Sequence, residues 1–304
     1  MSLLLLHWDI ILMLHEVDKK LHGSLLAAII GWVEVIAFLA ETFFVMVVAI
    51  ASRSLLHTIV SFVAPHDTHT TSLPDVLFDA GFLILYLLRR SAINFHQPST
   101  VAWAHRLGLS PQPLSRLSQG CIVYQIAGFG CFVLWQAWTR EWVLSLANYY
   151  SSHGDNSLQV AHLAEILVLS PIKEELVFRG LVFHLLLNRL PTHPTAAAIV
   201  SSVLFGCTHL VNLKQSKFST LYVLIQTGLG VEIGFFYALT YARTESLFEC
   251  ITLHVVNNVL SSFTSTQMEL TSSPYLAPLL AHSILLYALL IIWSLHTLAK
   301  TSTC

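Results

Sequence analysis

Residues 171–180 read PIKEELVFRG, and they place two carboxylates, a lysine and an arginine between two strongly apolar runs. The run before them is LAEILVLS (163–170), and the run after them is LVFHLLL (181–187). Ionisable side chains inside a membrane cost about 2.5–3.5 kcal/mol each, so they normally face a protein interior or a water-filled cavity. The stretch therefore predicts a buried polar site inside a helical membrane protein.

The composition of the 304-residue chain favours the same class. Hydrophobic residues make up 55% of the chain and charged residues only 11%, whereas soluble domains usually carry about 25% charged residues. A chain with so few charges cannot cover a water-facing surface, so we expect it to reside in a lipid bilayer. The net charge is −2 and the basic residues are dispersed, which argues against nucleic-acid binding.

Apolar runs recur along the whole chain. A spanning helix needs roughly 20 apolar residues, and on that basis we expect about seven or eight spanning or half-spanning helices around a polar intramembrane cavity. The fold class is therefore all-α and polytopic. Pro171 is expected to break or kink its helix just before the two glutamates. The apolar runs are 24–51, 74–88, 118–138, 158–170, 175–190, 194–212, 219–242, 245–263 and 276–298. We expect N-terminal helices and loops in 1–150, a catalytic core in 151–265, and a last helix with a short tail in 266–304.

Three segments carry polar residues within these runs, and they are Glu174–Arg179, Phe205–His209 and His254–Asn258. Residues four apart share one face of a helix. Glu175 can therefore pair with Arg179, Phe205 can pack against the ring of His209, and His254 and Asn258 can reach one point. Glu174 lies about 100° away from Glu175 around the helix axis and is left to point elsewhere.

These residue types suffice for the hydrolysis of an amide without a protein nucleophile. Glu174 can act as general base on a water that His209 helps to hold and polarise. His254 and Asn258 can donate hydrogen bonds to the oxyanion that develops in the reaction.

The order EExxxR, FxxxH, HxxxN on successive apolar helices resembles the CPBP family (CaaX proteases and bacteriocin-processing enzymes). The resemblance covers about 158–262, where PIKEELVFRG and GLGVEIGFFYALTYARTESLFECITLHVVNN carry it. It implies an intramembrane glutamic endopeptidase, in which Glu174 and His209 activate water. It also implies that His254 and Asn258 form the oxyanion hole, supported by Glu175, Arg179 and Phe205. The implied partner is a peptide or a prenylated protein, in the plasma membrane of a bacterium or the endoplasmic reticulum of a eukaryote.

Two other classes of protein remain open on the sequence. A membrane adaptor could keep the same polar residues for packing, because His and Asn often bond across helices. A small-solute transporter could use Glu34 and Glu41, although the chain lacks the repeat symmetry of many transporters.

The sequence also carries residues that could bind a metal and several further polar residues. Glu174, His209 and His254 could surround a Zn²⁺ ion, but HExxH is absent and no histidine pair has a usual ligand spacing, so no metal is expected. Gly230-xxx-Gly234 is interpreted as a close helix contact. Glu232 and His184 have no assigned role.

Overall fold

The structure is a computed structural model with side chains. It describes residues 108–140, 158–189, 194–214, 218–263 and 276–301, and isolated residues between 29 and 40 and between 142 and 150. The chain divides into two compact units, 1–68 and 69–304, and the second holds all the elements discussed below. Glu34, Glu41 and the predicted helix at 74–88 lie outside the described residues.

Every element in the described part of the chain is helical, as the sequence predicts. Four of the helices are long and apolar enough to cross a membrane, so the chain is an integral membrane protein. The number of seven or eight spans and the division into three regions stay predictions. The elements are α5 (Arg116–Thr139), α6 (Val160–Ala164), the π-helix η1 (Glu165–Leu169), α7 (Ser170–Glu175), the π-helix η2 (Leu176–Phe183), α8 (His184–Arg189), α9 (Pro194–Thr208), the 3₁₀-helix η3 (His209–Lys214), α10 (Thr220–Thr244), α11 (Leu247–Ser261) and α12 (Leu276–Thr301).

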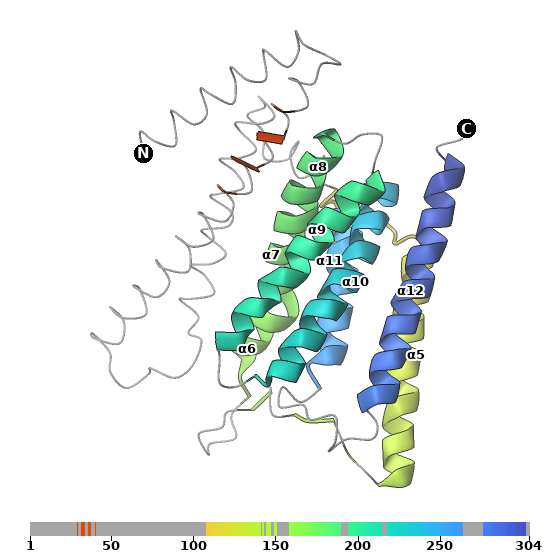
Figure 1. The fold of residues 1–304 in the computed structure, drawn as a ribbon. Helices are drawn as coiled ribbons and strands as arrows, with labels where there is room; N and C mark the ends of the chain where they lie inside the picture. Colours follow the sequence, from red (N-terminus) through yellow and green to blue (C-terminus); the bar gives the residue numbers. More distant parts are fainter. Residues whose placement is uncertain are drawn as a thin grey trace, which may run out of the picture. The chain divides into compact units, whose positions relative to one another are not determined.

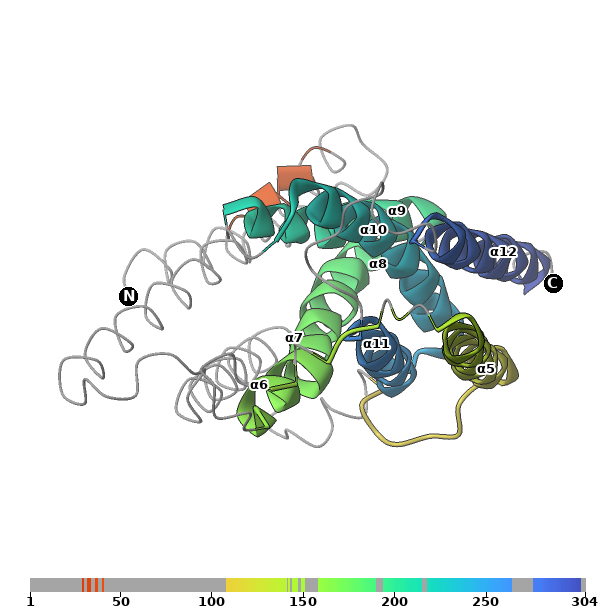
Figure 2. The same cartoon turned by 90° about the horizontal axis from the view of Figure 1, so that it is seen from below.

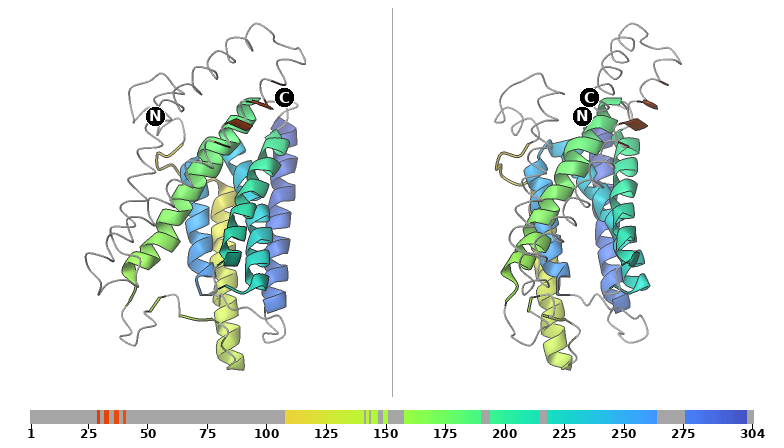
Figure 3. Two further views of the ribbon diagram at one scale, coloured as in Figure 1. Left: turned by 60° about the vertical axis from the view of Figure 1, so that its left-hand side comes forward. Right: turned by 90° about the vertical axis from the view of Figure 1, so that its left-hand side faces the viewer.

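Of the break or kink expected at Pro171, the break is wrong, because the backbone from Val160 to Arg189 is one continuous helical path (Figure 3). A proline inside a helix lacks an N–H and its ring collides with the carbonyl four residues earlier. Here the preceding turn, η1, is widened, and the Ser170 N–H bonds to the Glu165 carbonyl five residues back. A π-turn of this kind takes up the disturbance without ending the helix.

The helices pack in an order that brings the three polar segments together. Helix α10 packs along α9 and also against α12, while α11 packs against α7, η1 and α5. Figure 2 shows α11 between α7 and α5, and Figure 1 shows α9 and α10 side by side. Helix α11 therefore packs against α7, which carries the two glutamates, and α9 packs against η2, which follows α7.

Helix α11 is tied to α5 at both ends. At one end the Phe248 N–H donates to the Gly108 carbonyl at 2.9 Å, and Ser115, just before α5, donates to the Glu249 carboxylate. At the other end the Ser145 N–H donates to the Phe263 carbonyl at 2.8 Å. Gly108 has φ = 64°, and a methyl group there would lie 2.0 Å from the Glu245 carbonyl oxygen. A glycine is therefore required for this approach.

Candidate active site

Glu175 and Arg179 form the buried base of the site. Arg179 Nη1 lies 3.0 Å from Glu175 Oε1, and both side chains are 0% exposed. The predicted salt bridge between these two residues is therefore present. Removing two charges from water costs more than their attraction returns unless further hydrogen bonds satisfy them. Arg179 and Glu175 each make one further hydrogen bond, to Gly234 and His254, while Glu175 Oε2 and Arg179 Nε have no hydrogen-bond partner among the described residues.

Arg179 reaches from η2 to α10. Its Nη2 atom donates to the Gly234 carbonyl at 2.9 Å, and its guanidinium carbon lies 4.6 Å from the centre of the Phe205 ring. A methyl group at Gly234 would lie 2.9 Å from Arg179 Nη2, so the glycine makes room for the guanidinium. Phe205 thus packs against the buried ion pair and against His209, with ring centroids 5.4 Å apart.

Glu174 has a different environment from its neighbour. Its side chain is 28% exposed, and its Oε2 atom lies 3.6 Å from His254 Nε2. Its other oxygen accepts a hydrogen bond from Ser170 Oγ at 2.7 Å. Glu174 is therefore the carboxylate that is fixed in direction yet open to an approaching molecule.

His254 lies between the two glutamates. Its Nδ1 atom is 2.7 Å from Glu175 Oε1, and the side chain is 7% exposed. A carboxylate can only accept, so Nδ1 carries the proton of this bond. The Nε2 atom is then directed toward Glu174, and it either accepts a proton or, once protonated, donates a hydrogen bond. The buried Glu175 therefore fixes the ring orientation of His254, in the way carboxylates orient catalytic histidines.

Asn258, one turn after His254 on α11, donates from Nδ2 to the Ile166 carbonyl at 2.9 Å. That carbonyl lies in η1, where Ser170 bonds to Glu165 rather than to Ile166. The next residue, Pro171, has no N–H to offer. The π-turn and the proline thus leave a carbonyl that Asn258 satisfies. An amide nitrogen has two hydrogens, so a second donor remains for an oxyanion.

His209 is the first residue of η3, directly after α9. Its ring lies against Gly230 of α10, where a methyl group would be 2.9 Å from His209 Cδ2. Within the described part of the chain His209 makes no hydrogen bond to Glu174. The predicted close contact at Gly230 and Gly234 is confirmed, because a side chain at either position would displace a site residue.

All seven predicted site residues therefore gather in one region, and they come from α7, η2, α9, η3 and α11. The sequence did not reveal the roles of Ser170 and Ile166, or that the Gly234 carbonyl binds Arg179. Ser170 lies four residues before Glu174, a spacing that could have revealed it. The other two act through backbone carbonyls, for which the side-chain pattern gives no signal.

Chemically, the site offers a carboxylate, an oriented imidazole, a second imidazole and an amide. No group of three or more His, Cys, Asp or Glu in the described ranges is arranged to hold a metal ion. Independence from a metal stays a prediction and needs a direct test.

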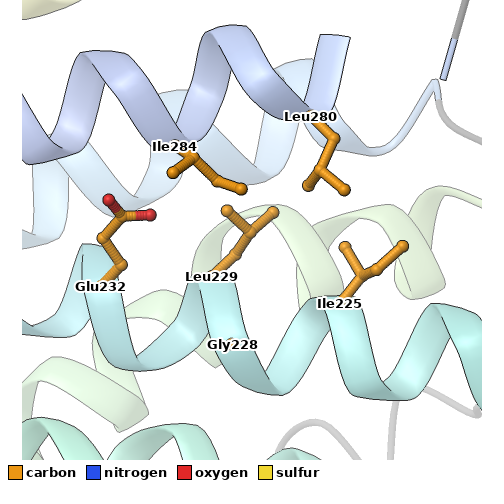
Figure 4. A pocket seen from close by; sticks show the side chains of 6 residues that line it. All are labelled: Ile225, Gly228, Leu229, Glu232, Leu280 and Ile284. Carbon is orange, nitrogen blue, oxygen red and sulfur yellow. The ribbon is translucent and has the colours of Figure 1, made fainter. Parts of the chain in front are cut away.

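Glu232 lies away from this region. It lines an apolar groove of about 340 Å³ between α10 and α12 together with Ile225, Gly228, Leu229, Leu280 and Ile284 (Figure 4). The polar intramembrane cavity expected from the sequence is a different feature and stays a prediction. His184 is half-buried at the start of α8.

The comparisons with known proteins agree with the residue pattern. The family described as type II CAAX prenyl endopeptidase, Rce1-like, matches residues 156–260. The matched range contains all seven predicted site residues. No curated protein and no solved structure has a significant match to the chain.

Proposed function

We propose, from the match of residues 156–260 to the family described as type II CAAX prenyl endopeptidase, Rce1-like, that this integral membrane protein is an intramembrane glutamic endopeptidase. Its substrate is a peptide or protein that carries a prenyl group near its C-terminus. Glu174, His209, His254 and Asn258 perform the chemistry, and Glu175, Arg179 and Phe205 support them.

The observation that carries this proposal is the difference in burial and bonding between Glu174 and Glu175. Glu175 is fully buried and bonded to Arg179 and His254, whereas Glu174 is 28% exposed and faces His254 Nε2 at 3.6 Å. A general base must be reachable by the water that it activates. Glu174 meets this requirement and Glu175 does not.

In the proposed reaction Glu174 takes a proton from water while the water oxygen attacks the scissile carbonyl carbon. His209 holds this water from the other side. The oxyanion accepts hydrogen bonds from protonated His254 Nε2 and from the second amide hydrogen of Asn258. The C–N bond then breaks, and Glu174 returns its proton to the departing amine.

The test is cleavage of a farnesylated peptide ending in a CaaX sequence by the purified, detergent-solubilised chain. We expect Glu174→Gln to lower the rate by about 10²–10⁴-fold, the contribution of a general base. A chelator should leave the wild-type rate unchanged. An unprenylated peptide of the same sequence serves as the substrate control.

Two outcomes would contradict the proposal. Cleavage that persists in Glu174→Gln would remove Glu174 as the base, and loss of cleavage with chelator would require a metal. If the wild type cleaves no prenylated peptide and cells carrying Glu174→Gln accumulate no uncleaved precursor, the non-catalytic adaptor is the better interpretation. The transporter alternative rests on Glu34 and Glu41 and gains no support from the described residues.

A further inference from the structure

Tyr287 stands out on α12, a helix that lies outside the matched range 156–260. Leu285, Leu289 and Ile292 of α12 are exposed, but Tyr287 is only 2% exposed. Its ring packs against Phe236 of α10, with ring centroids 5.9 Å apart. A buried tyrosine usually finds a partner for its hydroxyl, and Tyr287 has two.

The Tyr287 hydroxyl connects three helices. It accepts a hydrogen bond from Gln125 Nε2 of α5 at 2.5 Å, and it donates one to Asn257 Oδ1 of α11 at 3.3 Å. We call these three residues the Tyr287 tie. The hydroxyl acts as both acceptor and donor, so the tie fixes the direction in which each amide points.

Asn257 links the tie to the site. It directly precedes Asn258 and lies three residues after His254 on the same helix. A rotation or shift of α11 that broke the bond from Tyr287 to Asn257 would therefore move both predicted oxyanion donors. The tie acts at mid-helix, between the two ends at which α11 is joined to α5.

The structure assigns to Tyr287 a positioning role for the predicted oxyanion donors. Through Asn257 its hydroxyl sets the rotation of α11 and thereby the placement of His254 and Asn258. This inference rests on the proposed function, and it extends the working site to α5 and α12. A misplacement of about 1 Å at an active site can cost on the order of 10²-fold in rate, so a tie of this kind has a measurable effect.

The first test compares Tyr287→Phe with the wild type in peptide cleavage. The variant keeps the buried ring and loses the hydroxyl. We expect kcat to fall by about 10-fold or more while KM stays within about twofold, because the substrate is still bound but the donors are displaced. An unchanged kcat overturns the inference.

Tyr124→Phe is the matched control. Tyr124 lies on α5 and stacks on His282 of α12 at 5.4 Å, so it belongs to the same pair of helices, but it is 48% exposed. Its kcat should match the wild type. If both variants lower kcat equally, the effect is a general loosening of α5 and α12, and the positioning role is refuted.

Asn257→Ala tests whether Tyr287 acts through α11. The single variant should lower kcat as Tyr287→Phe does, and the double variant should be no worse than either one. Additive losses would show that Tyr287 acts by another route.

A readout without cleavage separates this inference from the proposed function. Cys250 is buried one turn before His254, and its Sγ donates to the Tyr237 carbonyl at 3.4 Å. Alkylation of Cys250 by a membrane-permeant maleimide, followed by mass spectrometry, should be faster in Tyr287→Phe than in wild type or Tyr124→Phe. Equal rates overturn the positioning role, even if the wild type turns out to be inactive.

Discussion

Glu174 and Glu175 are neighbours in the sequence and have opposite surroundings in the structure. Glu175 shares one oxygen between Arg179 Nη1 and His254 Nδ1. Glu174 accepts a hydrogen bond from Ser170 at one oxygen, and its other oxygen lies 3.6 Å from His254 Nε2. The 100° rotation between consecutive helical residues produces this difference. Glu174 is therefore open to an approaching molecule, while Glu175 is enclosed by its two partners.

This difference predicts that the same substitution, glutamate to glutamine, lowers the stability of the protein at one position and not at the other. Glu175→Gln leaves the buried guanidinium of Arg179 without its counter-charge, and breaking a buried pair in this way costs about 3–5 kcal/mol. We expect a clearly lower thermal unfolding temperature in detergent and no cleavage.

Glu174→Gln is the control for that experiment. It removes a charge that is 28% exposed, so the unfolding temperature should stay close to that of the wild type while cleavage is lost. Equal destabilisation by both variants would contradict the assignment of Glu175 to support and Glu174 to catalysis.

Among the elements, the widened turn η1 has a consequence that a regular α-helix would not have. It leaves the Ile166 carbonyl for Asn258, because Pro171 provides no competing N–H. The proline therefore helps to orient a predicted oxyanion donor on another helix.

Pro171→Ala should expose this role. The alanine restores an N–H that can bond to the Ile166 carbonyl, and alanine is favoured over proline inside a helix by about 3 kcal/mol. We expect unfolding at the same or a higher temperature, together with a loss of cleavage of about 10-fold, less than the 10²–10³-fold that removing an oxyanion donor costs. Pro278→Ala, in the exposed first turn of α12, should change neither. Undiminished cleavage by Pro171→Ala would show that the Ile166 carbonyl does not position Asn258.

The crossing of α9 and α10 gives a second prediction for these elements. In Gly230→Ala the new methyl group would lie 2.9 Å from His209 Cδ2 and 3.3 Å from the Gly206 Cα atom. His209 must then move, so we expect slower cleavage, measured as kcat.

Gly228→Ala, two residues earlier on α10, is the control for Gly230→Ala. No atom lies within 4 Å of its added methyl group, and alanine gains about 1 kcal/mol of helix propensity over glycine. This variant should cleave normally and unfold at a slightly higher temperature. Normal kcat in Gly230→Ala would mean that His209 tolerates displacement.

The sequence alone predicted the helical class, the contact at Gly230 and the grouping of the site residues. These features depend on side-chain periodicity and on residue types that are costly in lipid. The continuous helix through Pro171 could not be predicted, because the choice between a break and a π-turn depends on whether another helix satisfies the carbonyl that is left over. Asn258 does so from 92 positions away in the chain. The role of Gly234 was hidden for a similar reason, since its carbonyl is the group that binds Arg179.

At the scale of the whole molecule, the described helices from α5 to α12 alternate in direction across the bundle (Figure 1). The starts of α5 and α11 are joined through Ser115 and Glu249, and their ends through Ser145 and Phe263, so these two helices run parallel. Helix α10 is followed by α11 after only two residues and runs the opposite way (Figure 1).

This arrangement predicts on which side of the membrane particular residues lie. Glu245, at the α10–α11 turn, and Trp142, after α5, are both exposed and should lie on opposite sides. Single cysteines at these two positions, with Cys131, Cys207 and Cys304 replaced by serine, should react with an impermeant maleimide from opposite faces of sealed vesicles. Labelling of both from the same face would contradict the alternation of these helices across the membrane.

The pairing of Glu175 with Arg179 also bears on how the protein is made. Both charges lie on one helix, four residues apart, so the segment can neutralise itself as it leaves the ribosome-bound translocation channel. Two unpaired charges would oppose insertion by about 2.5–3.5 kcal/mol each. His254 and Asn258 follow later in the chain, on α11. They reach the membrane after the segment that carries Glu175 and Arg179. The order of residues along the chain thus lets the most costly part of the site enter the bilayer without waiting for its partners.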